Sequence, residues 1–169
     1  ETPWRTLLGD LEALHWTVGG RNVELAIFGH PPQWLEGLQH VRVHGWTSQE
    51  ETLFHLENCD ILYLPFWFDE KHLESAQQCF PSKLSTYVAA GRAILYHGPD
   101  RSAPCTFFSK YPAALQSHSL APGSLAVLLR QLVQSPGLLD SLSKASQQAA
   151  AQALREDRFL ESFRKLMAS

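Results

Sequence analysis

The sequence predicts an α/β fold in which a parallel β-sheet carries helices on both faces. Short runs of apolar residues, typical of strands buried on both faces, alternate along the chain with segments of helical periodicity. Glycine or proline follows most of the apolar runs and ends them. Because such alternation implies right-handed crossovers, successive strands are expected to lie parallel.

The chain is expected to begin with a helix that follows Thr2. Pro3 favours this start, because proline at the first helical position gives up an amide that lacks a partner anyway. One face of the segment is apolar and carries Trp4, Leu7, Leu8, Leu11 and Leu14, before Gly19 and Gly20 stop the helix. Since a crossover helix normally follows a strand, a further strand upstream of this helix is expected.

The same signals predict the remaining elements. Ser48 and Glu51 form a capping-box pattern, Pro81 opens a helix, and Gly91 is well placed to end it. Residues 65–80 are expected to form a loop rich in aromatic and charged side chains. Strands are expected at residues 23–28, 41–44, 60–64, 93–96 and 113–115, and helices at residues 48–59, 82–90, 124–134, 138–154 and 158–167.

Length and composition predict a single globular domain over residues 1–169 and argue against several functions. A charged fraction of 18% beside a hydrophobic fraction of 44% is typical of a folded chain. The net charge of −3 and the lack of any Lys/Arg run argue against a nucleic-acid partner. No CxxC or HExxH spacing occurs, so no metal site is expected. Three widely spaced cysteines and the absence of a long apolar run favour a cytoplasmic location.

The segment most suited to ligand chemistry is the helix start at Pro81, Ser82 and Lys83. In parallel sheets ligands bind beyond the carboxyl ends of the strands, which directs attention to residues 29–32, 45–48, 65–81 and 97–102. Free amides and a partial positive charge at a helix start suit a phosphate group, and Lys83 adds a full charge. The alternative is an ordinary solvated helix start, and the physics alone leaves both open.

Residues 80–96 resemble the P-S-K-L-x-E-Y-x-A-A-G-x-P-V segment of family-4-type glycosyltransferases with the two-domain GT-B fold. Residues 25–29 are similar to the strand and glycine of their donor domain, and residues 41–65 to a following strand–helix–strand run. The resemblance covers nearly the whole chain and implies a Rossmann-like C-terminal, donor-binding domain. It further implies that an N-terminal acceptor domain lies upstream, outside this chain, and that no cofactor is needed.

The resemblance also implies roles for individual residues. Ser82, Lys83 and Leu84 would meet the diphosphate of the donor, with Lys83 as the catalytic residue. Trp46 and Thr47 would border the nucleobase, and Gly29 the sugar-phosphate cleft.

Two positions depart from the pattern of the family. Its paired glutamates, of which the second holds the ribose hydroxyls, would fall at Gln78 and Thr86. An amide and a hydroxyl still bind sugar hydroxyls, although a carboxylate accepts stronger hydrogen bonds. The departure therefore favours a second hypothesis, in which a degenerate domain binds a nucleotide or a protein partner without transfer.

Several other residues allow two interpretations. Phe66, Trp67 and Phe68 are suited to stacking on a sugar, to facing a second domain, or to burial in the core. His97 follows a strand, where contact with a phosphate and a purely structural role are equally consistent. His40 and His44 alternate on a strand and need no ligand.

The acidic residues Asp69, Glu70 and Glu74 fit a solvated loop better than a replacement for the acid missing at Gln78.

The resemblance therefore implies that the chain is the donor-binding half of a glycosyltransferase that moves a hexosyl group from a UDP- or GDP-sugar. The acceptor would be a carbohydrate or a lipid-linked molecule held by the upstream domain, without which this chain is expected to be inactive. The expected location is the cytoplasm, or the periphery of the inner membrane for a longer protein. A nucleotide-sugar epimerase of similar architecture is a further alternative that fits residues 81–83 less well.

Overall fold

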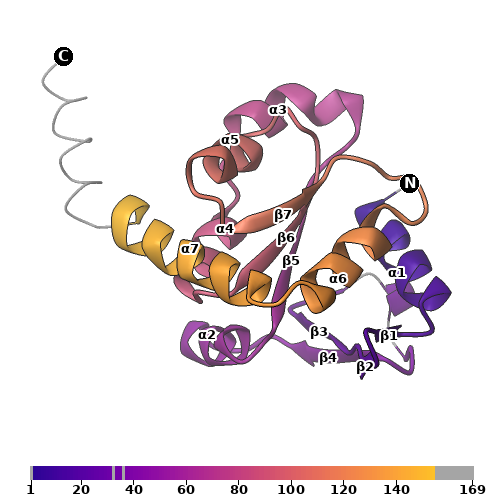
Figure 1. Cartoon of the computed structure of the whole chain (residues 1–169). Helices are drawn as coiled ribbons and strands as arrows, with labels where there is room; N and C mark the ends of the chain where they lie inside the picture. Colours follow the sequence, from indigo (N-terminus) through magenta and orange to yellow (C-terminus); the bar gives the residue numbers. More distant parts are fainter. Residues whose placement is uncertain (1, 32, 36, 155–169) are drawn as a thin grey trace, which may run out of the picture.

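The computed structural model describes residues 2–31, 33–35 and 37–154 and has the predicted α/β architecture (Figure 1). Three parallel strands, in the order β5-β6-β7, form its centre: β5 (Ile61–Pro65), β6 (Ala93–His97) and β7 (Ala114–Ser117). A separate parallel pair consists of β3 (Leu25–Phe28) and β4 (Val41–Gly45). No hydrogen bond joins the two units, so the described strands do not form one continuous sheet.

Helices cover both faces of the strands. α1 (Pro3–Ala13) lies beside α6 (Ser124–Gln134) on one face, and α4 (Ser82–Ala89) packs against α7 (Leu138–Ala153) (Figure 1). The other helical segments are α2 (Gln49–Glu57), α3 (Leu73–Gln78), α5 (Ala103–Lys110), and the short 3-10 helices η1 (Gln33–Leu35) and η2 (Glu70–His72). None of the helices in the described ranges is both long and apolar enough to cross a membrane.

Strand β6 separates two hydrophobic clusters, because successive side chains of a strand point to opposite faces. Leu95 belongs to the cluster under α1 and α6 (the α1/α6 cluster), together with Leu7, Leu8, Leu11, Ile27, Leu125 and Leu129. Ile94 and Tyr96 belong to the cluster under α4, α5 and α7 (the α4/α5 cluster), together with Leu62, Leu64, Leu84, Val88 and Phe108. All five side chains of β6 are buried, as expected of a strand covered by helices on both sides.

The sequence-based element predictions are confirmed for most of the described residues. Residues 65–80, expected to form a loop, contain α3, and α5 lies at residues to which no element was assigned from the sequence. Residues 17–22 form the hairpin β1 (Thr17–Val18) and β2 (Arg21–Asn22) where only a helix stop was expected. Both residues of its two-residue turn, Gly19 and Gly20, have positive φ, as such hairpins require. The helix expected at 158–167 lies outside the described residues.

The buried carboxylate of Asp10 ties α1 to α6. Gly123 stands at the N-cap of α6 and offers no side chain to the first amides of the helix. Asp10 replaces it: one carboxylate oxygen accepts from the Gly123 N–H (2.6 Å), and the other from the amides of Leu125 (2.8 Å) and Ala126 (3.0 Å). Its negative charge also lies at the positive end of the α6 dipole, where it is stabilising. Thr6 adds a hydrogen bond to the Leu120 carbonyl at 3.3 Å.

Removal of this carboxylate should destabilise the protein strongly. In Asp10→Ala three amides at the start of α6 lose a charged acceptor, and we expect a loss of about 2–4 kcal/mol in the free energy of unfolding. Asp140→Ala is the matched control: Asp140 lies exposed in the first turn of α7, where a charge contributes roughly 0.3–1 kcal/mol. Urea unfolding of both variants measures the difference, and equal losses would contradict the proposed role of Asp10.

Candidate functional site

The start of α4 carries unoccupied amides and a positive charge. Its N-cap is Pro81, which provides no side-chain cap, and its first turn contains no acidic residue. The Leu84 amide donates to the Pro81 carbonyl (2.9 Å), whereas the amides of Ser82 and Lys83 have no acceptor among the described residues. Because α4 connects the parallel strands β5 and β6, it begins on the side of the sheet where β5 ends.

The side chains of this segment divide into buried and exposed groups. Leu84 is fully buried in the α4/α5 cluster, so its side chain serves the fold. Ser82, Lys83 and Gln78 are exposed, and Lys83 forms no ion pair with any residue of the described ranges. Thr86 is half-buried and turns its hydroxyl back to the Ser82 carbonyl at 3.5 Å. The cationic side chain is therefore free to meet an anion.

A second group of predicted site residues lies where β3 and β4 end. Gly29 donates its N–H to the Gly45 carbonyl (2.6 Å), and both glycines have positive φ, which turns the chain out of each strand. A Cβ at either position would meet nothing within 4 Å, so the space above both turns is open. Trp46 follows with 79% of its surface exposed, and its ring lies 5.6 Å from that of His30.

Thr47, in contrast, is engaged in local structure. Its hydroxyl lies 2.6 Å from that of Thr52, within the N-terminal turn of α2.

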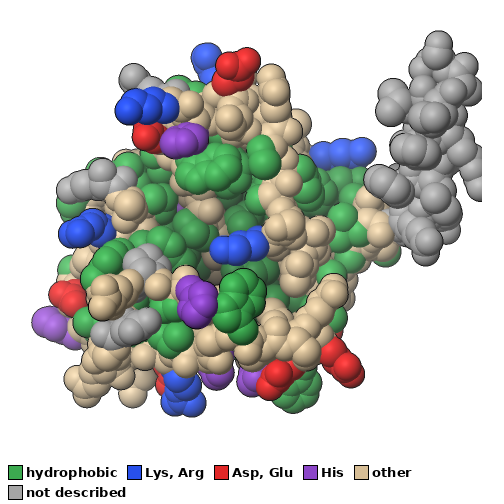
Figure 2. All heavy atoms as spheres, turned by 180° about the vertical axis from the view of Figure 1, so that it is seen from behind, with side chains coloured by type: hydrophobic (Ala, Val, Ile, Leu, Met, Phe, Trp, Pro, Cys, Tyr) green, Lys and Arg blue, Asp and Glu red, His purple; other side chains and the backbone are tan. Residues whose placement is uncertain are grey.

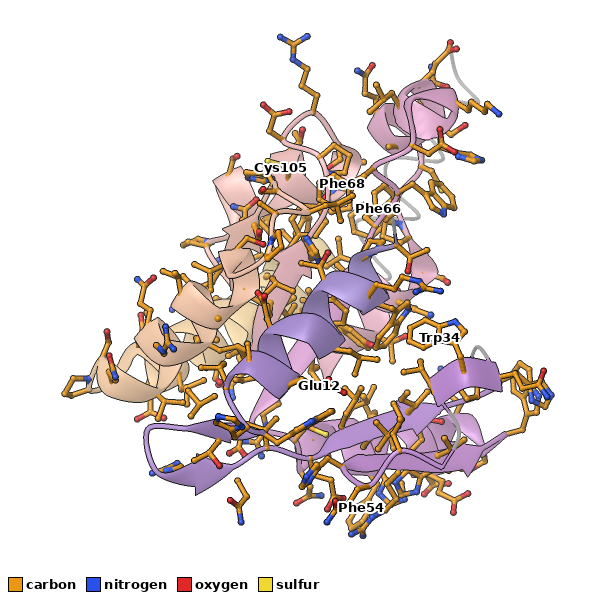
Figure 3. The ribbon with its side chains drawn as sticks, turned by 90° about the vertical axis from the view of Figure 1, so that its right-hand side faces the viewer. Glu12, Trp34, Phe54, Phe66, Phe68 and Cys105 are labelled. Carbon is orange, nitrogen blue, oxygen red and sulfur yellow. The ribbon has the colours of Figure 1, made fainter. Side chains whose placement is uncertain are left out.

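The structure thus brings the predicted site residues together in two groups: Ser82, Lys83 and Thr86 on α4 with Gln78 at the end of α3, and Gly29, Trp46 and Thr47 at the ends of β3 and β4. No hydrogen bond or ring contact among the described residues joins the groups. The aromatic side chains near the two groups are also separated: in Figure 3 Phe66 and Phe68, which follow β5, lie apart from Trp34 on η1. Seen from behind, hydrophobic side chains gather over the middle of the molecule with Lys, Arg and His side chains among them, and charged side chains of both signs lie toward the margins (Figure 2).

The three aromatic residues that follow β5 differ in their burial and in their contacts. Phe66 is buried, stacks on Trp67 at 5.0 Å and packs against Tyr96. Phe68 meets the ring of His97 edge-on at 5.0 Å. Trp67 keeps 46% of its surface exposed and leans on His72. Of the three, Trp67 is therefore the side chain that remains available for a ligand or a partner.

His97 is a structural residue. It is fully buried, its Nε2 lies 2.8 Å from the Ser119 carbonyl, and its Nδ1 lies 2.8 Å from the Tyr63 hydroxyl. In the neutral ring Nε2–H donates to the Ser119 carbonyl, and Nδ1 shares the single Tyr63 hydroxyl proton with the Pro3 carbonyl, which lies 3.0 Å from the same oxygen. Burial lowers the pKa of His97 below its ordinary value and outweighs the opposing effects of the Ser119 carbonyl and Asp10. Both ring nitrogens are occupied within the fold, so neither is free for a phosphate.

The other polar candidates are accounted for by their surroundings. Asp69 is exposed and accepts a hydrogen bond from the Lys71 amide at 3.1 Å. His40 stacks on Trp16 at 4.9 Å, and His44 on Phe28 at 4.7 Å. Glu74 is exposed on α3, and the Glu70 side chain lies outside the described part of the structure. Within that part no group of three metal-binding side chains occurs.

The three cysteines are free thiols in different environments. Cys59 and Cys105 are half-buried, and burial raises the pKa of both thiols. Cys79 is exposed in the turn between α3 and α4.

Two cavities lie away from the α4 start. One, of about 360 Å³, lies between α1 and the start of α6 and is lined by Arg5, Asp10 and Arg130 among others. The second, of about 520 Å³, lies beside Trp16 and His40. In the first cavity the Asp10 carboxylate is already hydrogen-bonded to amides of α6. The shape of the two cavities does not by itself identify either as a ligand site. The exposed positive charge of Lys83 is a stronger chemical indication of an anion-binding site.

Comparison with models of known protein families and with curated proteins finds no match to this chain.

The His97 network predicts a pH dependence of stability. Because folding lowers the pKa of His97, its contribution is complete above the unfolded value of about 6.5 and is lost as the pH falls below it. We therefore expect the free energy of unfolding to decrease between pH 7 and pH 5, and to decrease less in His97→Gln. His30→Gln, at an exposed position, is the control and should keep the original slope. Denaturant unfolding at each pH tests this, and an unchanged slope in His97→Gln would refute it.

Proposed function

We propose that this chain binds the diphosphate of a nucleotide sugar at the start of α4 and acts as the donor-binding half of a glycosyltransferase. The observation that carries the proposal is the α4 start itself, where the amides of Ser82 and Lys83 are free and no acidic side chain occupies the first turn. A helix start of this kind attracts phosphate oxygens, and the Lys83 ammonium adds a charge-assisted hydrogen bond.

The proposed reaction transfers a hexosyl group from a UDP- or GDP-sugar to a carbohydrate or lipid-linked acceptor held by a second domain, and UDP or GDP is the leaving group. As the sugar leaves, negative charge grows on the diphosphate. Lys83 and the two amides would stabilise that charge in the transition state, which is a large term in many enzymes. The open turns at Gly29 and Gly45 would admit the rest of the donor, with Trp46 beside the base. Gln78 and Thr86 would bind sugar hydroxyls as neutral groups.

A second function, nucleotide or protein binding without transfer, is favoured by one observation. Neither Gln78 nor Thr86 provides a carboxylate, and the Thr86 hydroxyl is turned toward the backbone of its own helix. Affinity for a nucleoside diphosphate is expected of a transferase and of a nucleotide-binding domain, and transfer by the protein joined to its acceptor domain distinguishes these two. A domain that binds only a protein partner is expected to show neither.

The diphosphate site predicts a clear difference between ligands. UDP or GDP should bind more tightly than the corresponding nucleoside, because the nucleoside lacks the groups that meet Lys83. Lys83→Ala should weaken diphosphate binding by about 1–3 kcal/mol, the scale of a hydrogen bond to a charged group. Lys144→Ala removes an exposed lysine from α7 and should leave the affinity unchanged. Titration calorimetry measures both, and equal affinity for nucleoside and diphosphate would count against the site.

Thr86→Glu tests the ribose position. A carboxylate there would bridge two ribose hydroxyls, so UDP or GDP should bind several-fold more tightly, with a smaller gain for the 2′-deoxy nucleotide. The matched control is Thr106→Glu: Thr106 lies on α5 and bonds the carbonyl four residues earlier, as Thr86 does. Calorimetry and melting temperature are measured together. A loss of stability without nucleotide binding would show that the added charge is buried unpaired and would overturn the ribose assignment.

A further inference from the structure

The cavity of about 520 Å³ lies between the end of α1 and the turn before β4. Its lining consists of Glu12, His15, Trp16, Leu38, Gln39 and His40. The Leu25 amide at the start of β3 donates to the His40 carbonyl (2.9 Å), so the cavity lies at the amino ends of β3 and β4. Figure 3 shows Glu12 above the purple strands at the bottom of the view, away from Phe66 and Phe68. The cavity is therefore separate from the turns at the carboxyl ends of β3 and β4.

Helix α1 ends in a turn that places two side chains under backbone strain. The His15 amide donates to the Glu12 carbonyl (2.9 Å) and the Trp16 amide to the Leu11 carbonyl (2.8 Å), which is the hydrogen-bond pattern of a Schellman motif. The residue that follows the C-cap in this motif is left-handed and is usually glycine. Here His15 has φ 51° and Trp16 has φ 52°, so two consecutive residues with side chains adopt this conformation.

Helix α4 has glycine at the corresponding position. Gly91, with φ 66°, follows the C-cap Ala90 and donates to the Val88 carbonyl at 3.1 Å. Glycine adopts this conformation without steric cost, whereas a side chain there costs free energy. His15 and Trp16 are the non-glycine residues of the described ranges with positive φ, and both line the cavity. Backbone strain of this kind is concentrated at functional sites.

The charge at this end of α1 is also unfavourable without a partner. Glu12 is exposed in the last turn of the helix, where the carbonyl groups carry partial negative charge and a cation is preferred. The last turn contains no basic residue, and Glu12 forms no ion pair with any residue of the described ranges. The cavity is lined by no lysine or arginine. A cation in the cavity would meet the carboxylate and the negative end of the helix together.

We propose that this cavity binds an organic cation, an ammonium or guanidinium group on a short alkyl chain. The Glu12 carboxylate pairs with the charge, and the Gln39 amide oxygen accepts a further hydrogen bond from the ligand. The imidazoles of His15 and His40 each offer an acceptor nitrogen when neutral, and Leu38 offers apolar surface to the alkyl chain. No three metal-binding side chains of the described residues are placed to hold a metal ion, which favours an organic ligand. The inference does not rest on the proposed function.

The experiment titrates two probes into the full chain and follows the imidazole and indole signals by NMR. Agmatine, which carries a guanidinium and an ammonium group, represents a free small molecule, and a blocked glycyl-arginyl-glycine peptide represents a side chain of a protein. Glu12→Gln should weaken binding by at least about tenfold, because it removes the charge from a side chain of similar shape. Glu57→Gln is the matched control, since Glu57 is likewise exposed in the last turn of a helix, α2, and should leave the affinity unchanged.

A second variant, His15→Gly, gives α1 the residue that α4 has after its C-cap. Glycine adopts a positive φ freely, so the melting temperature should stay the same or rise. Loss of the imidazole acceptor should weaken agmatine binding by roughly two- to tenfold. A turn that is strained only to reverse the chain would gain stability in this variant without any change in affinity.

The outcomes decide the proposal as follows. Saturable binding of either probe, weakened in Glu12→Gln and His15→Gly but not in Glu57→Gln, supports it, and the tighter probe identifies the source of the cation. Absence of saturable binding, unchanged affinity in Glu12→Gln or His15→Gly, or an equal loss in the control overturns it. Lys83→Ala should weaken the nucleoside diphosphate and leave agmatine binding unchanged, so failure of this inference and failure of the proposed function are distinguishable.

Discussion

The arrangement of this molecule depends on a single buried carboxylate. Asp10 lies on the inner face of α1 among leucines, where an unpaired charge would be costly. It is stable there because α6 presents three amides to it, and α6 in turn has no cap of its own. Each helix therefore requires the other. Through this pair the α1/α6 cluster is assembled, and with it one of the two layers that cover β6.

Local signals predicted most of the fold. Apolar runs identified the five parallel strands, and Ser48 caps α2 through the Glu51 amide as its sequence pattern indicates. The misses have local reasons. Ser102 caps α5 through the Cys105 amide, but no Glu or Gln stands three residues after it to complete a capping-box pattern, and the helix is short. The separation of β3–β4 from the central sheet could not be predicted, since periodicity identifies strands without assigning their neighbours.

The site was less predictable than the fold. Sequence identified Lys83 correctly as an exposed charge at a helix start, and the structure assigns Leu84 to the core and His97 to an internal network. The role of Asp10 was missed, although an acidic residue within the apolar stripe of α1 was a visible signal. Its partner lies more than a hundred residues away in the chain, and no spacing rule connects them. Contacts between residues that lie far apart in the chain cannot be predicted from the local patterns of a single sequence.

The distribution of thiols gives the protein a natural attachment point for a probe. Alkylating reagents react with thiolates, so the burial that raises the pKa values of Cys59 and Cys105 slows their modification. Cys79 is exposed and precedes the start of α4 by three positions. A thiol-reactive fluorophore added in limiting amount would therefore attach mainly to Cys79, at the edge of the candidate site, without any engineered substitution. Its emission would report directly on whatever approaches Lys83.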